Sequence, residues 1–296
     1  LFQQIPMSEN SPSVIQHHLE RVLMIFQHSL GIIDILETMT PMDFLDFRDF
    51  LFPASGFQSF QFRKIETILG LRLENRHPYQ NDLFYKTLKP EQQQAIEKLM
   101  HAPSLFDQLE AWLARLPFMD TSDFHFWSEY KNQVHQMIER DTQIVKSNPR
   151  LTDTEREKAI AMFQASQLQF EALFDQEKFQ ALQAQGYFRM NQKAILGALF
   201  ILTYRDHLIL SQPFQILKAL QGLDETLAQW RYRHALMAHR MLGKKVGTGG
   251  SGGHDYLRDS TEKHKVFGDL FNLSTFLLPK SLTPNLPEGL KLKMTL

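Results

Sequence analysis

The chain has 296 residues, with 32 lysines and arginines against 33 aspartates and glutamates, and it contains no cysteine. This length predicts one or two domains and is ample for a sizeable hydrophobic core. The balanced charge argues against a nucleic-acid-binding protein, which usually has a strongly basic surface. The lack of cysteine excludes disulfides, zinc–thiolate sites, iron–sulfur clusters, thiolate-ligated haem and cysteine nucleophiles. The longest strongly apolar run, residues 194–202, is much shorter than a membrane-spanning helix requires.

The composition favours helices along the whole chain. Only six valines occur, no stretch alternates apolar and polar residues for long, and the helix formers Leu, Ala, Gln, Glu, Lys and Met dominate. We therefore expect an all-α fold, with one helical domain over residues 1–279. Residues 280–296 contain Pro284 and Pro287 and are expected to form a loose C-terminal tail.

Helix boundaries can be placed from capping residues, prolines and glycines. Thr40, Pro41 and Asp43 have the spacing of an N-cap, a first-turn proline and an acidic third residue, and Thr152 is expected to cap a later helix. The expected helices cover, in chain order, residues 14–38, 43–51, 57–69, a segment opened by Pro90, 124–145, 152–174, 191–204, 212–241 and 266–278.

A glycine-rich segment follows the long helix expected over residues 212–241. Three of its glycines, Gly247, Gly249 and Gly252, match the G-x-G-x-x-G pattern. A dinucleotide site of that pattern needs a strand before the glycines, and here a helix precedes them. Two interpretations remain open: a flexible surface connection, or a segment that approaches a ligand closely and offers the hydroxyl of Thr248.

His234 is the histidine whose surroundings best suit a cofactor. No H-E-x-x-H motif occurs, and His239 lies about 140° further around the same expected helix, so the two cannot share one metal ion. A single imidazole is sufficient, however, to hold haem iron. Trp230 lies one turn earlier, and Met237 and Met241 follow on the same face. The alternative is an ordinary core or surface histidine.

Arg48 is a candidate for binding a carboxylate. It lies one helical turn after Phe44, and Leu51 follows three residues later, so the guanidinium would lie on an apolar face. An arginine in such a pocket can bind a carboxylate with two parallel hydrogen bonds. The alternative is a surface ion pair with Asp46 or Asp49.

Several long motifs, in order along the chain, resemble the tryptophan 2,3-dioxygenases. The resemblance extends from the first expected helix to about Pro279. The matching motifs are Glu37-Thr-Met-Thr-Pro-Met-Asp-Phe44, Asp46-Phe-Arg48, Pro53-Ala-Ser-Gly-Phe-Gln-Ser59, Gln61-Phe-Arg63, Tyr232-Arg-His234, His239-Arg-Met-Leu-Gly243, Gly247-Thr-Gly-Gly-Ser251, Asp255-Tyr-Leu-Arg258 and Lys265-Val-Phe-Gly-Asp-Leu-Phe-Asn-Leu-Ser-Thr-Phe276.

The resemblance implies an all-α, cytoplasmic enzyme that binds haem b and forms a homotetramer. Such enzymes add both atoms of O2 across the indole 2,3-bond of L-tryptophan, which gives N-formylkynurenine and starts tryptophan catabolism by the kynurenine pathway. The expected partners are therefore L-tryptophan, O2 and further copies of the chain, with no nucleic acid and no membrane.

The resemblance also assigns roles to single residues around the substrate. Arg48 resembles the residue that binds the substrate carboxylate, and Phe44 matches a wall of the indole pocket, with Leu51 near it. Thr248 resembles a residue that contacts the ammonium and carboxylate end of the substrate. Gly56 matches the turn that lines the distal side of the haem, and the resemblance places it among the substrate-binding residues.

A second set of roles concerns the cofactor. His234 resembles the axial ligand of the haem iron. Ser55, next to Gly56, matches the turn on the distal side of the haem, and Arg63 and Trp230 resemble neighbours of the haem propionates.

One feature of the family has no counterpart in this sequence. Family members carry an earlier segment with a distal histidine, which this chain lacks before its first matching helix. We expect that segment to be absent, cleaved or carried on another chain, so no catalytic residue beyond the haem iron is assigned. Two alternative functions follow: a haem monooxygenase or hydroxylase of the same scaffold acting on another aromatic amino-acid derivative, and a non-catalytic helical scaffold.

Overall fold

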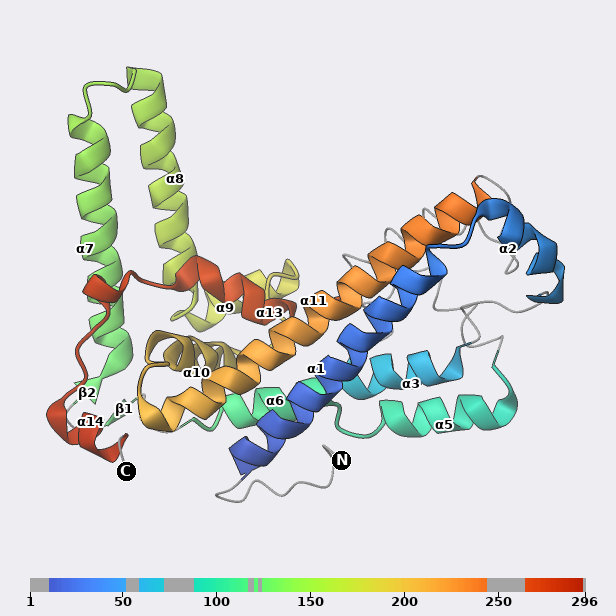
Figure 1. Ribbon diagram of the computed structural model, residues 1–296. Helices are drawn as coiled ribbons and strands as arrows, with labels where there is room; N and C mark the ends of the chain where they lie inside the picture. Colours follow the sequence, from blue (N-terminus) through green and yellow to red (C-terminus); the bar gives the residue numbers. More distant parts are fainter. Residues whose placement is uncertain are drawn as a thin grey trace. The chain divides into compact units, whose positions relative to one another are not determined.

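A computed structural model describes residues 11–51, 59–71, 88–116, 120–121, 124–243 and 264–294 (Figure 1). The fold is all-α, as predicted. Within these ranges the extended structure is one antiparallel pair of two-residue strands, β1 (Asp120–Thr121) and β2 (Phe124–His125). The described residues form two compact units, one from residues up to Leu109 together with Lys218–Gly268, the other from Glu110–Leu217 together with the residues from Asp269 onward.

The first unit contains the elements around which the candidate site is built. They are α1 (Ser11–Leu36), α2 (Pro41–Arg48), η2 (Asp49–Leu51), α3 (Phe60–Leu69), α5 (Pro90–Met100), the first part of α6 (Leu105–Leu113) and most of α11 (Leu208–Leu242). Helices α3 and α5 pack together, and Phe60 covers the buried side chains of Leu88 and Ile96.

Helix α2 begins where the sequence predicts a cap. The Thr40 hydroxyl accepts a hydrogen bond from the Asp43 backbone N–H at 3.2 Å, and the Asp43 carboxylate accepts one from the Thr40 N–H at 2.9 Å. Pro41 is the first helical residue, where its missing N–H would have no partner in any case. This reciprocal capping box orients the short helix that carries Phe44 and Arg48.

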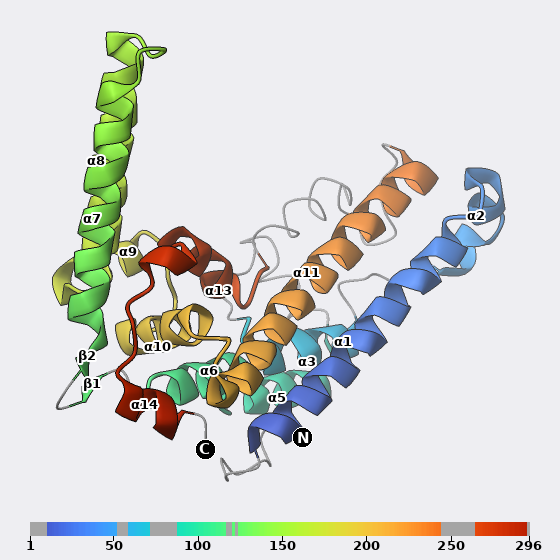
Figure 2. The same cartoon turned by 60° about the vertical axis from the view of Figure 1, so that its left-hand side comes forward.

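Helices α1 and α11 of the first unit run side by side and in the same direction (Figures 1 and 2). Near their middles, the side chain of Leu23 fits over Gly222, where an added Cβ would lie 3.3 Å from it. Further along, Arg233 forms ion pairs of 2.6 Å with both Asp34 and Glu37. These contacts hold the end of α1, and hence the start of α2, beside the C-terminal half of α11.

The second unit is arranged around a mostly buried helix, α10. Its elements are α7 (Phe126–Ser147), α8 (Asp153–Ala172), α9 (Gln176–Ala184), α10 (Gln192–Thr203), α13 (Gly268–Asn272, counted here from Asp269), η5 (Leu273–Phe276), η6 (Lys280–Leu282) and α14 (Glu288–Lys293). Every residue of α10 from Ala194 to Leu202 is buried with a single exception.

 Leu196 is the one partly exposed residue of that run. Gly197 is required there, because a Cβ at this position would lie 2.3 Å from the carbonyl oxygen of Leu113.

Helices α7 and α8 pack against each other as a hairpin. The predicted cap of α8 is present: the Thr152 hydroxyl accepts a hydrogen bond from the Glu155 N–H at 3.3 Å, and the Glu155 carboxylate accepts one from the Thr152 N–H at 2.8 Å. At the base of α7, Phe126 is fully buried and its ring meets that of Phe200 edge to face at 5.0 Å. Six phenylalanines of this unit are buried: Phe126, Phe170, Phe179, Phe188, Phe200 and Phe276.

Several element boundaries differ from the sequence-based expectation, and the helix expected over residues 266–278 is instead α13 followed by the 3-10 helix η5. Two further differences have a clear physical cause. Helix α11 begins at Leu208, not near residue 212, so Pro213 lies inside it. Leu210, Pro213 and Leu217 are all buried at helical spacing, and burial of this stripe compensates for the hydrogen bond that the proline cannot donate.

The second difference concerns the segment expected to form a loose tail. It carries η6 and α14, and Leu286, Leu290 and Met294 are buried. The Tyr204 hydroxyl donates a hydrogen bond to the Pro284 carbonyl at 2.8 Å. Apolar residues spaced four apart hold this segment on the second unit, although its prolines suggest a loose end.

None of the described helices is by itself long and apolar enough to cross a membrane. Two bent pairs meet the same criterion by length and composition alone, α1 with α2 and η2, and α10 with α11.

Candidate haem and substrate site

His234 lies in the C-terminal half of α11, in a row of three aromatic rings. Its imidazole is partly buried and lies 5.3 Å from the Trp230 ring, tilted by 35°. Trp230 in turn stacks on Phe62 of α3, with ring centroids 5.1 Å apart and an angle of 28°. The predicted neighbourhood of His234 and Trp230 is therefore observed, and Phe62 is an addition that the sequence analysis did not single out.

The state of the His234 imidazole suits a metal ligand. Burial lowers its pKa below the ordinary value of 6.5, so the ring is neutral at neutral pH. A neutral imidazole has the free lone pair that iron requires. Within the described ranges, the His234 imidazole makes no hydrogen bond or ion pair, and no group of three or more His, Asp or Glu side chains could hold a metal ion. One imidazole beside flat apolar rings fits a haem better than a bare metal ion.

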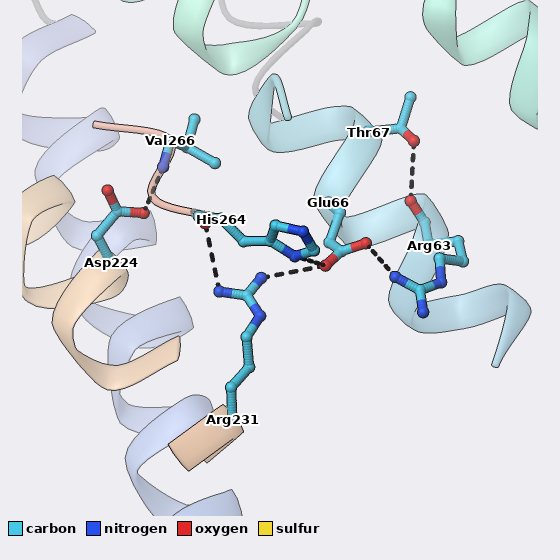
Figure 3. Close-up of polar contacts among 7 residues, drawn as sticks. All are labelled: Arg63, Glu66, Thr67, Asp224, Arg231, His264 and Val266. Atoms are coloured by element: carbon cyan, nitrogen blue, oxygen red, sulfur yellow. Dashed lines mark hydrogen bonds and ion pairs between the residues drawn. The ribbon is translucent and has the colours of Figure 1, made fainter. Parts of the chain in front are cut away.

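A buried group of charged side chains, drawn in Figure 3, contacts Phe62 of this row through two arginines. Glu66 of α3 binds Arg63 through Oε2 at 2.7 Å and Arg231 of α11 through Oε1 at 3.1 Å. Arg231 also donates a hydrogen bond to the backbone carbonyl of His264 at 3.3 Å. The side chains of all four residues are at most 6% exposed. We call Arg63, Glu66, Arg231 and His264 the Glu66 cluster.

Asp224 of α11 binds the backbone just after His264. Its carboxylate accepts hydrogen bonds from the backbone N–H groups of Val266 at 3.0 Å and Phe267 at 2.6 Å. Burial raises the pKa of Asp224 from 3.8 to about 6, although these two hydrogen bonds and the charge of Arg231 act in the opposite direction. The buried carboxylate therefore destabilises the fold when it is ionised.

Replacing Asp224 with asparagine is expected to change how stability depends on pH. In the wild type, the folded chain holds the Asp224 proton up to about pH 6 and the unfolded chain loses it near pH 3.8. Stability therefore falls as the pH rises between these values, by roughly 3 kcal/mol in all, and stays at the lower level above pH 6. Urea unfolding at several pH values should show this fall in the wild type and not in Asp224→Asn. Parallel curves for the two proteins would contradict the assignment.

The predicted substrate residues lie on α2 and η2. Phe44 and Arg48 are partly buried and one turn apart, and Phe44 contacts Phe47 edge to face at 5.5 Å. Leu51, in η2, is 41% exposed. Arg240 of α11 donates a hydrogen bond to the Glu37 carbonyl at 3.0 Å, so the chain that leads into α2 is held near the end of α11.

The remaining predicted residues divide into two groups. Arg63 lies in the Glu66 cluster, and Trp230 lies between Phe62 and His234. Ser55, Gly56 and Thr248 lie outside the described residues.

Glu66 and Asp224 were not predicted from the sequence. The available signals were weak: an arginine and a glutamate three residues apart in α3, and an aspartate and an arginine seven apart in α11. Each pattern is common on helices that bind nothing.

An all-α fold with a partly buried, neutral imidazole on a long helix, beside aromatic rings, suits a haem protein. Comparison with known proteins is more specific. A family model described as tryptophan 2,3-dioxygenase matches residues 1–277. The chain is 50% identical over 294 residues to the tryptophan 2,3-dioxygenase of Bdellovibrio bacteriovorus, across 99% of this chain and 82% of that protein.

Relatives with lower identity give the same result. The identity is 43% over 293 residues to the tryptophan 2,3-dioxygenase of Alteromonas mediterranea, across 99% of this chain and 81% of that protein. It is 38% over 290 residues to that of Dictyostelium discoideum, across 98% and 72%. The chain belongs to the tryptophan 2,3-dioxygenase family, which confirms the family predicted from the motifs.

Proposed function

We propose that this chain is a haem-dependent tryptophan 2,3-dioxygenase. It adds both atoms of O2 across the 2,3-bond of the indole ring of L-tryptophan and gives N-formylkynurenine, the first step of tryptophan catabolism by the kynurenine pathway. The observation that carries the proposal is the 50% identity to a tryptophan 2,3-dioxygenase over 99% of the chain.

The residues around His234 fit the cofactor. Haem supplies the iron that binds O2 and the oxygen chemistry when it is bound. His234 would hold it, because its imidazole is neutral and partly buried. Trp230 would support the imidazole from one turn earlier, since its own ring is fixed against Phe62.

The chain's contribution to substrate binding is assigned to α2. Arg48 would bind the carboxylate of tryptophan with two charge-assisted hydrogen bonds, and Phe44, on the same side of the helix, would contact the indole ring. Leu51 would extend that apolar surface, and Thr248 would contact the charged end of the substrate. These contacts orient the indole, which is the part of catalysis that a protein contributes when a cofactor performs the chemistry.

Isotope labelling of the product tests the proposed reaction. The purified chain with haem is supplied with L-tryptophan and 18O2, without added peroxide, and the product is identified by its absorbance and mass. We expect N-formylkynurenine with two labelled oxygen atoms. A hydroxylated product with one labelled atom would favour the monooxygenase alternative, and failure to take up haem would favour the non-catalytic scaffold.

Assembly and location are further parts of the proposal. We infer a homotetramer, supported by exposed apolar side chains on α1 and η2, including Ile35 at 70% and Phe50 at 86% exposure. Light scattering should give about four times the chain mass of 34.6 kDa, and a monomer would contradict it.

A cytoplasmic location is supported by the lack of cysteine in the chain. Fractionation of the host cell tests it, and recovery outside the cytoplasm would contradict it.

A further inference from the structure

Glu66 is the residue through which three parts of the first unit meet. One carboxylate oxygen binds Arg63 of the same helix, and the other binds Arg231 of α11. The imidazole Nδ1 of His264 lies 3.7 Å from the same oxygen that binds Arg231. Both arginines of this buried group form an ion pair with Glu66, so its negative charge stabilises both guanidinium groups.

The cluster is in direct contact with the aromatic row that contains His234. The guanidinium carbon of Arg231 lies 5.7 Å from the centre of the Phe62 ring, and that of Arg63 lies 6.0 Å from it. Phe62 therefore has guanidinium groups near its ring and Trp230 stacked on it. A shift of either arginine would move Phe62 and, through it, the Trp230 ring that lies beside the His234 imidazole.

The cluster also fixes the rotation of α11 about its own axis. Asp224 and Arg231 are seven residues apart, almost two full turns, so they lie on the same face of the helix. Both bind the segment that begins at His264: Arg231 its carbonyl, and Asp224 the N–H groups of Val266 and Phe267. With this face held, Trp230 and His234 are directed to a different side of α11.

We propose that Glu66 is a positioning residue for the haem ligand: by holding Arg231 against α3, its carboxylate sets the orientation of α11 and thereby of Trp230 and His234. The inference rests on the proposed role of His234. Glu66 itself need not touch haem or substrate. Its effect is transmitted by Arg231, which lies between Trp230 and His234 in the sequence of α11.

The test compares Glu66→Gln with the wild type in haem binding. Glutamine has nearly the same shape and removes only the charge, which leaves two buried arginines without their shared carboxylate. Haem is titrated into the protein as purified without it, and the Soret absorbance gives the dissociation constant per folded molecule. We expect an increase of about tenfold, as for other outer partners of metal ligands, and a changed Soret maximum.

Asp269→Asn is the matched control. Asp269 is a buried carboxylate of the second unit, 4% exposed, and it accepts hydrogen bonds from the N–H groups of Arg189 and Met190. It should lower the unfolding temperature and leave haem affinity unchanged. If Glu66→Gln behaves in the same way, Glu66 is merely structural and the inference is overturned.

A second variant covers the case in which Glu66→Gln does not fold. Arg231→Lys keeps the positive charge, yet a lysine cannot bind Glu66 and the His264 carbonyl with a planar fork. Haem affinity should again fall about tenfold, and unchanged affinity would overturn the inference. A wild type that binds no haem would instead refute the proposed function, so the two failures are distinguishable.

Discussion

Replacing His234 with alanine is expected to abolish stable haem binding. The imidazole is the one nitrogen ligand assigned to the iron, and its pKa is lowered by burial, so the wild-type ring is ready to bind without first losing a proton. Alanine removes this ligand and leaves the apolar face of Trp230 intact. The purified variant should lack the Soret band of the wild type, or lose it on gel filtration, with its helical circular dichroism unchanged.

His239→Ala is the control for that experiment. His239 is on the same helix and exposed, about 140° around from His234. It should therefore retain haem with the wild-type spectrum. A normal Soret band in His234→Ala would contradict the assignment of the iron ligand, and loss of haem from both variants would show a general effect on α11.

Replacing Arg48 with alanine is expected to raise the KM for tryptophan steeply while haem stays bound. A partly buried guanidinium that binds a carboxylate contributes about 2–4 kcal/mol, so kcat/KM should fall by roughly 30-fold or more. Steady-state kinetics with tryptophan measure the change. Tryptamine, which lacks the carboxylate, should lose little activity in the variant, because the interaction removed is one that it never makes.

Arg140→Ala provides the matched comparison. Arg140 is an arginine of α7 that pairs with the adjacent Asp141 at 3.1 Å, and its side chain is 55% exposed. Its removal should change neither KM nor haem content. If Arg48→Ala gave the same result, Arg48 would be a surface ion-pair partner of Asp46 or Asp49, as the alternative interpretation holds.

Features set by neighbouring residues could be predicted from the sequence. The capping boxes of Thr40 with Asp43 and of Thr152 with Glu155 each depend on two residues three positions apart. The all-α class follows from composition in the same way, because helix propensity is a local property. The family could be predicted because its motifs are long and occur in order.

The start of α11 at Leu208 and the order of the C-terminal segment with η6 and α14 could not be predicted in this way. Pro213 suggests a helix start, and Pro284 and Pro287 suggest a loose end, since each proline lacks an N–H. Burial of Leu210 and Met294, among others, outweighs those local preferences. Such burial depends on what lies opposite in space.

The sequence by itself therefore determined the helical class, the caps, the family and the residues, His234 and Arg48 among them, that motifs single out. The tertiary structure alone decided how those residues are supported. Arg231 and Glu66 are 165 positions apart in the chain, and Asp224 and Val266 are 42 apart. Their pairing arises only when α3, α11 and the segment after residue 264 come together, because a charge is stable in a dry interior only beside the partner that the fold brings to it.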